Sequence, residues 1–200
     1  IRDVERSRGL GDVYKRQVYT QDDSDKANEL ATEVLENYSI DTNQRILDLM
    51  CMKIGLDGSK KNNQEILRNL LKLMMDNESD FTITFRSLSD ILLNNSDNFL
   101  AQFHQKDEVS GWINNWKSAL NLENKKVGEI ILNLNNTNPI YIPRNHQVQK
   151  AIEESYLGNL KVLEEMLDVL KNPFQENVSL SHYSEAPSEQ QRVTQTFCGT

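Results

Sequence analysis

The segment Asn138–His146 carries two prolines, Pro139 and Pro143, and an arginine directly after the second one. Proline fixes its own φ and restricts the residue before it, so the residues between the two prolines are held extended. A rigid segment of this kind can deliver Arg144 to a fixed place. Its guanidinium could bind a phosphate or a carboxylate in bidentate fashion, or it could tie down buried carbonyl groups or a carboxylate between helices. We favour the structural role.

A second candidate is the thiol of Cys198, which lies third from the end of the printed sequence. It is either an exposed thiol without a function or a redox group that forms and breaks a disulfide with a distant partner. The residues alone do not decide between the two. The other cysteine, Cys51, falls on a predicted helix close to its apolar face, where burial would make it inert.

The three histidines, His104, His146 and His182, are scattered and lack the spacing of a metal site or a catalytic triad. We therefore interpret them as surface or structural residues. Trp112 and Trp116 lie one helical turn apart, as two rings stacked on a ligand would. On an otherwise apolar helix face, packing in the core is the better interpretation.

Nucleotide-binding motifs have little support in this chain. Asp80-Phe81-Thr82 superficially resembles the metal-binding Asp-Phe-Gly of kinases, but it lacks the glycine and no catalytic-loop motif precedes it. We predict instead that Asp80 caps the start of a helix. The chain also has no glycine-rich phosphate loop. We assign no catalytic, cofactor-binding or metal-binding residue.

Apolar residues recur at helical spacing along most of the chain from Asp22 onward. Asp41 and Thr42 offer cap chemistry for a second helix, and Gly55 suits its C-terminus. Phe81–Phe85 alternates like a strand, but no partner strand is evident and we predict a helix. The predicted helices cover about residues 22–38, 41–54, 66–74, 81–92, 109–120, 125–134, 148–156 and 160–170.

Three parts of the chain differ in pattern. Residues 1–17 show no helical or strand period, and we expect either a non-native scar or a loop. Residues 18–174 are helical. Residues 175–200 are rich in Ser, Glu and Gln with almost no periodicity, and we expect an extended tail of limited order.

Composition narrows the class of protein. The net charge of −8 and a pI of about 5.0 argue against a nucleic-acid partner. Two cysteines are too few for a secreted disulfide scaffold. No apolar run approaches the roughly 18 residues of a membrane span, and no apolar region typical of a signal peptide is present. We expect a soluble, cytoplasmic bacterial protein without a membrane or nucleic-acid partner.

Five segments, in this order and spacing, resemble the C-terminal end of the selenoprotein O family, from about Gln44 to Thr200. They are Ser79–Leu88, Asn138–His146, Ala151-Ile152 with Gly158-Asn159-Leu160, Asn172-Pro173-Phe174, and Thr196-Phe197-Cys198-Gly199-Thr200.

The resemblance implies a kinase-like enzyme that binds ATP with a divalent metal, Mg or Mn, and transfers AMP to Ser, Thr or Tyr hydroxyls of protein substrates. In that family the nucleotide-binding and metal-binding residues lie upstream of the matched region, so none is carried over here. Cys198 stands where the family has Cys or selenocysteine, which makes it the redox candidate. Here Gly-Thr follows it in place of Ser-Ser.

We therefore expect a mainly α protein, the helical C-terminal part of a kinase-like adenylyltransferase that is inactive by itself. The alternative is a non-catalytic helical interaction module whose apolar helix faces bind a partner.

Overall fold

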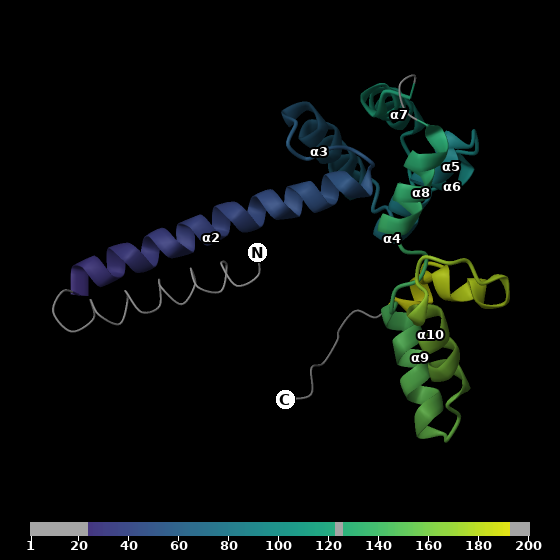
Figure 1. Ribbon diagram of the computed structural model, residues 1–200. Coiled ribbons are helices and arrows are strands. Elements are labelled where there is room, and N and C mark those ends of the chain that lie inside the picture. The colour runs from purple at the N-terminus through teal and green to yellow at the C-terminus, as the bar shows by residue number, and fades with distance from the viewer. Residues whose placement is uncertain (1–23, 123–125, 193–200) are drawn as a thin grey trace. The chain divides into compact units, whose positions relative to one another are not determined.

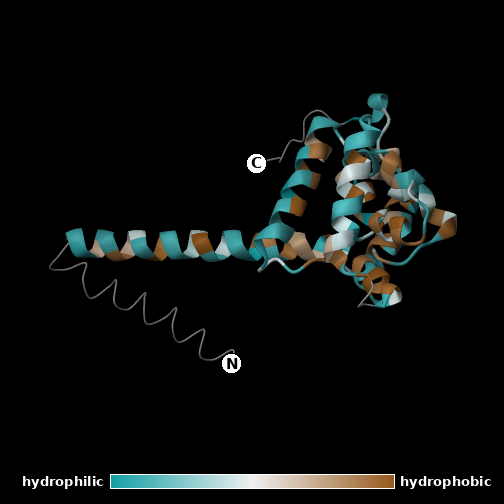
Figure 2. Cartoon of the chain, turned by 90° about the horizontal axis from the view of Figure 1, so that it is seen from above, coloured by the Kyte–Doolittle hydropathy of each residue, from teal (hydrophilic) through white to brown (hydrophobic). Residues whose placement is uncertain are grey.

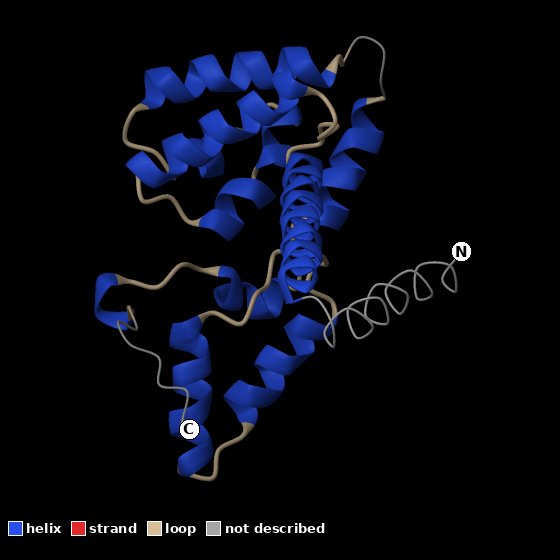
Figure 3. Ribbon diagram, turned by 90° about the vertical axis from the view of Figure 1, so that its left-hand side faces the viewer, coloured by secondary structure: helices blue, strands red, loops and turns tan. Residues whose placement is uncertain are grey.

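The computed structural model of the protein describes residues 24–122 and 126–192. All regular elements within these ranges are helices, joined by short loops (Figures 1 and 3). The mainly α fold class predicted from the sequence is therefore confirmed. The chain divides into two compact units, residues 1–48 and 49–200. No helix of the described ranges combines the length and the apolar content needed to cross a membrane.

Helix α2 (Ser24–Lys53) is one continuous helix of 30 residues, and the break predicted at Asp41 and Thr42 is wrong. No glycine or proline interrupts the segment. A cap side chain stabilises a helix start by only about 1 kcal/mol. A helix can therefore continue through such a residue when nothing else interrupts its backbone hydrogen bonds. The predicted end is confirmed: Gly55 follows α2 in the left-handed region, at φ +72°.

Helices α3 (Lys61–Asp76) and α7 (Lys106–Leu120) pack against each other around two tryptophans of α7. The rings of Trp112 and Trp116 stack with centroids 5.6 Å apart. Their indole N–H groups donate to the carbonyls of Ile66, at 2.9 Å, and Ile54, at 2.7 Å. Both side chains are buried, so the interpretation as core residues is confirmed.

The predicted helix over 81–92 forms, but as two short helices, α4 (Phe81–Arg86) and α5 (Leu88–Leu92). The Ser87 hydroxyl lies within hydrogen-bond distance of the carbonyls of Ile83, at 2.8 Å, and Thr84, at 3.1 Å. Serine bonding of this kind competes with the helix ladder and marks the break. Helix α6 (Asp97–Leu100) follows, and α8 (Val127–Thr137) packs against α5.

Helices α9 (Asn145–Tyr156) and α10 (Lys161–Lys171) form a hairpin and confirm the two helices predicted there. Gly158 supplies the positive φ, +82°, that the turn between them requires. The two helices lie side by side in Figures 1 and 3. They share a core made of Tyr141, Ala151, Met166, Val169 and Tyr183.

The segment after Pro173 is more structured than the sequence indicated. Residues 175–192 contain two 3-10 helices, η1 (Val178–Ser184) and η2 (Glu189–Gln191), in place of the extended tail expected from residue 175. The reason is Tyr183, which is only 3% exposed in the α9–α10 core. A single aromatic anchor gives no periodicity for a sequence to show. The expectations for residues 1–17 and for the last residues, 193–200, lie outside the described residues.

Candidate functional site

Arg144 and Asp80 form a two-point ion pair. Nη1 of Arg144 lies 2.6 Å from Oδ2 of Asp80, and Nη2 lies 3.2 Å from Oδ1. The side chains are 6% and 18% exposed, respectively. Parallel hydrogen bonds between a guanidinium and a carboxylate are among the strongest polar contacts in proteins, because charge and geometry both favour them.

Both partners stand at the start of a helix. Asp80 caps α4, as the sequence predicted, and its Oδ1 accepts the backbone N–H of Ile83 at 2.8 Å. Arg144 precedes α9, and its carbonyl accepts the N–H groups of Gln147 and Val148, each at 2.9 Å. The ion pair thus joins the N-terminal ends of α4 and α9.

The ion pair shifts the acidity of Asp80. Burial alone would raise the pKa of this carboxyl group. The hydrogen bond from Arg144, the N–H of Ile83 and the positive charge of Arg144 act in the opposite direction, and together they lower the pKa below its ordinary value. Asp80 is therefore a carboxylate at neutral pH and is not a general acid.

The beginning of the proline-bounded segment is anchored by Asn138, which is 1% exposed. Its amide donates to the carbonyl of Lys53 at 2.7 Å, and its Oδ1 accepts from Nζ of Lys53 at 3.3 Å. Nη1 of Arg86 donates to the carbonyls of Asn135, at 2.9 Å, and Asn138, at 3.0 Å. These carbonyls belong to the C-terminal end of α8, where a cation is electrostatically favoured.

Lys53 and Arg86 are both half-buried cations. Nζ of Lys53 lies 5.8 and 5.7 Å from the ring centroids of Phe81 and Phe85, a cation–π arrangement. Burial lowers the pKa of Lys53. Burial also lowers the pKa of Arg86, although the negative charges of Asp90 and Glu176 partly oppose it. Both cations thus contact Asn138, Lys53 at the side-chain amide and Arg86 at the backbone carbonyl.

Both Nη groups of Arg144 bind Asp80, and its buried Nε has no hydrogen-bond partner. A phosphate or a free carboxylate that bound both Nη groups in the same two-point manner would have to displace Asp80. This geometry favours the structural role of Arg144 over the phosphate-contact role, and both stay predictions.

The structure brings two of the three histidines together. His146 and His182 line one polar hollow of about 520 Å³, beside Lys150, Glu153 and Arg192. Burial and the nearby charge of Arg144 lower the pKa of His146. His104 is exposed and lies elsewhere in the chain. Among the described residues, no three His, Cys, Asp or Glu side chains are grouped so that they could hold a metal ion.

The two cysteines are placed differently. Cys51 is completely buried in the last turn of α2, as the sequence suggested. The redox candidate Cys198 lies outside the described residues.

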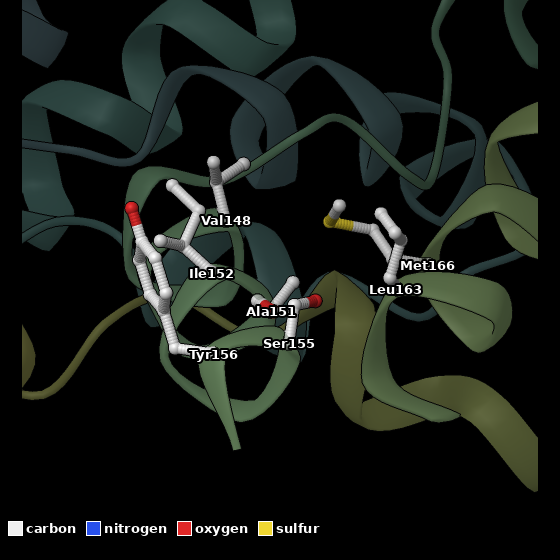
Figure 4. Close-up of a pocket in the computed structure, with 7 residues that line it drawn as sticks. All are labelled: Val148, Ala151, Ile152, Ser155, Tyr156, Leu163 and Met166. Atoms are coloured by element: carbon white, nitrogen blue, oxygen red, sulfur yellow. Dashed lines mark hydrogen bonds between the residues drawn. The ribbon is translucent and has the colours of Figure 1, made fainter. Parts of the chain in front are cut away.

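A second, apolar hollow opens between α9 and α10, with a volume of about 340 Å³. Figure 4 shows its side chains on both sides of the gap. The residues that line it are Val148, Ala151, Ile152, Ser155, Tyr156, Leu163 and Met166. It therefore offers an apolar surface with two hydroxyls, those of Ser155 and Tyr156, and no charge.

Comparison with known proteins decides the family. Residues 24–171 match the family model described as "Protein adenylyltransferase SelO". The chain belongs to the SelO family. The resemblance to selenoprotein O found in the sequence is thereby confirmed.

Curated relatives of this SelO chain are bacterial proteins described as "Protein nucleotidyltransferase YdiU". The protein of Rhizobium johnstonii is 34% identical over 179 residues, which is 88% of this chain and 36% of that protein. The protein of Maridesulfovibrio salexigens is 30% identical over 179 residues, 89% of this chain and 36% of that protein. The chain thus spans about a third of the length of the curated relatives it matches.

The SelO match covers all helices from α2 to α10, and with them Asp80 and Arg144. It ends at residue 171, before the 3-10 segment and before Cys198. The ion pair is therefore part of the family region.

Reasoning from the sequence identified Arg144 and Asp80 separately but missed that they pair. A signal was present, because both residues fall in segments shared with the SelO family. That signal could not show a contact across 64 residues of chain. Arg86, which binds the end of α8, was also missed, although it lies in the same shared segment as Asp80.

Proposed function

We propose that this chain is the C-terminal part of a SelO-type protein adenylyltransferase with a protein-kinase-like fold. The whole protein would transfer AMP from ATP to Ser, Thr or Tyr hydroxyls of protein substrates. The observation that carries this proposal is the match of residues 24–171 to the SelO family. The relatives, described as protein nucleotidyltransferases, support the same reaction class.

The nucleotide site is assigned to the part of the protein that this chain does not span. A Mg–ATP site needs oxygen ligands for the metal and cations aimed at the phosphates. In the described residues no three potential metal ligands come together. Arg144 is bound to Asp80, and Arg86 is bound to carbonyls at the end of α8. These side chains do not fit a metal–nucleotide site, and we derive no catalytic step from them.

The role proposed for this chain is structural support. The Arg144–Asp80 pair joins the beginnings of α4 and α9, and Asn138 anchors the loop between α8 and α9 to the end of α2. These contacts would keep the helices of the C-terminal part in fixed register. In this view Cys198 is the redox candidate of the whole protein and forms a disulfide with the upstream part.

The competing function is a non-catalytic helical interaction module. The observation in its favour is a set of exposed large apolar residues on α2, and Figure 2 shows apolar residues distributed along this helix. They are Val34, Leu35, Tyr38, Ile40, Ile46, Leu49 and Met52, each at least half exposed. Their number supports this alternative, because apolar residues that gather on a surface are typical of an interaction site.

Reading the source gene upstream of residue 1 separates the two functions. A reading frame that continues for roughly 300 residues, the length that the relatives have in excess of this chain, and encodes a nucleotide-binding lobe supports the adenylyltransferase. A start codon near residue 18 supports the interaction module. AMP transfer from labelled ATP to a protein by the complete product then tests the activity itself.

We also expect the isolated 200-residue chain neither to bind Mg–ATP tightly nor to transfer AMP, because phosphoryl-type chemistry requires positioned cations and a metal. Isothermal titration calorimetry of the chain with Mg–ATP tests this. Binding in the micromolar range would show that the nucleotide site lies within these residues.

A further inference from the structure

We propose that the apolar hollow between α9 and α10 is the packing site for an apolar segment of the SelO polypeptide that this chain does not span. The inference rests on the proposed function, because it requires that the chain be part of a longer protein. It adds a specific surface by which the two parts are joined.

The hollow is suited to an apolar group and to nothing charged. Its deepest residues, Ala151 and Met166, are 3% and 7% exposed. Its polar side-chain atoms are two hydroxyls: that of Ser155 donates to the carbonyl of Ala151 at 2.6 Å, and that of Tyr156 belongs to a residue that is 88% exposed. An apolar side chain entering the hollow would therefore leave the Ser155 hydroxyl with its partner.

The edge of the hollow is apolar as well. Ile152 is 46% exposed and Tyr156 is 88% exposed. Leu157, at 82%, and Leu160, at 50%, are exposed in the turn between the two helices. Exposed large apolar side chains gathered at a hollow are typical of a surface that a partner covers, so a covering partner is expected.

Residues 175–192 of the C-terminal segment pack on the core of the hairpin through Leu180 and Tyr183 of η1. Tyr183 of η1 contacts α10 through Val162 and Glu165, neither of which lines the hollow. The neighbouring face of α9, with Gln149, Lys150 and Glu153, is polar and lines the other hollow. Among the described residues, Ile152 and Tyr156 on the α9 edge of the apolar hollow stay exposed.

The length of the family proteins favours a segment of the same polypeptide as the occupant. Both α9 and α10 lie within residues 24–171, the range of the SelO match. The residues that line the hollow therefore lie in the range matched to the family. The chain accounts for only 36% of the Rhizobium johnstonii relative. Nearly two thirds of the family polypeptide is available to cover it, and covering it within one chain requires no association between molecules.

Hydrogen–deuterium exchange tests the proposal. Exchange of the peptides that cover α9 and α10 is compared between the 200-residue chain and the complete protein encoded by the extended reading frame. We expect these amides to exchange at least about tenfold more slowly in the complete protein, because local opening becomes harder when the surface is covered. Ile152→Asp should abolish this difference, since it places a charge on the edge of the hollow.

Two further variants complete the design. Gln149→Asp adds the same charge to the polar face of α9 and should leave the protection intact. Tyr156→Ala removes apolar surface without adding a charge, and it should reduce the protection even if the Ile152→Asp protein does not fold.

The other occupants give distinct results. Protection that appears in the isolated chain as its concentration rises indicates a second copy and overturns the proposal. If the isolated chain already shows protection, and truncation after Arg192 removes it, the occupant is the end of the same chain. This result also overturns the proposal. Equal exchange in the chain and in the complete protein also refutes it. In that case AMP transfer by the complete protein would still uphold the proposed function, so the two failures are distinguishable.

Discussion

At the scale of single residues, the guanidinium of Arg144 forms an ion pair with the carboxylate of Asp80. Arg144→Ala leaves that carboxylate partly buried without its cation, and it removes two hydrogen bonds between α4 and α9. We expect the free energy of unfolding to fall by about 1–3 kcal/mol, the usual cost of orphaning a buried partner. Urea denaturation of the two proteins measures it.

The control for this variant is Arg192→Ala. Arg192 lies 4.0 Å from Glu78, and both side chains are largely exposed. Surface pairs of this kind contribute little, so its stability should stay close to that of the parent chain. If Arg144→Ala also leaves the free energy of unfolding unchanged, and the complete enzyme with this substitution nevertheless loses activity, Arg144 belongs to the functional residues.

The same pair predicts a pH dependence. The pKa of Asp80 is lower in the folded chain than its ordinary value of 3.8. A carboxyl group with a lowered folded pKa contributes stability above its unfolded pKa, and this contribution is lost as the pH falls through the folded value. The stability difference between the parent chain and Asp80→Asn should therefore be constant from pH 7 to 5 and shrink below about pH 4. A difference that grows on acidification would contradict this sign.

At the scale of elements, the end of α2 depends on a glycine. Gly55 has φ +72°, and a Cβ there would lie 3.3 Å from Leu120 and 3.4 Å from Leu134. Gly55→Ala should destabilise the chain by about 1–2 kcal/mol, because L-residues are strained in this region. Thermal and urea unfolding measure the change.

Gly111 is the matched control. It lies within α7, and a Cβ there would meet nothing within 4 Å. Gly111→Ala should stabilise the chain by roughly 0.5–1 kcal/mol, because alanine loses less backbone entropy in a helix. If the two alanine substitutions change the free energy of unfolding in opposite directions, backbone conformation, and not residue size alone, determines their effect on stability.

At the scale of the whole molecule, we expect Cys198 to act as a redox switch only in the complete protein. Cys51 is completely buried, so it is not an accessible partner within this chain. The partner should then lie in the upstream part. Non-reducing peptide mapping of the oxidised complete protein, with AMP transfer measured with and without reductant, tests this. If Cys198 remains a thiol, or Cys198→Ser responds to reductant like the parent protein, the switch hypothesis is wrong.

Sequence by itself determined the helical class, most helix positions and the SelO family. Amphipathic spacing in α3, α7, α8, α9 and α10 is a local property, because one apolar face recurs every three to four residues whatever the helix packs against. The cap at Asp80 and the glycine after α2 are equally local, since each depends on the hydrogen bonds and dihedral angles of a few neighbouring residues.

Tertiary structure alone decided the contacts between residues distant in the sequence. The docking of Tyr183 depends on contacts with helices distant in the sequence. The continuity of α2 past Asp41 and the break at Ser87 are local, but they depend on weak preferences that the apolar pattern does not rank. The pairing of Arg144 with Asp80 joins residues 64 positions apart, and the hollow between α9 and α10 exists only once both helices are packed. No periodicity encodes such contacts, because they are set by the three-dimensional path of the chain.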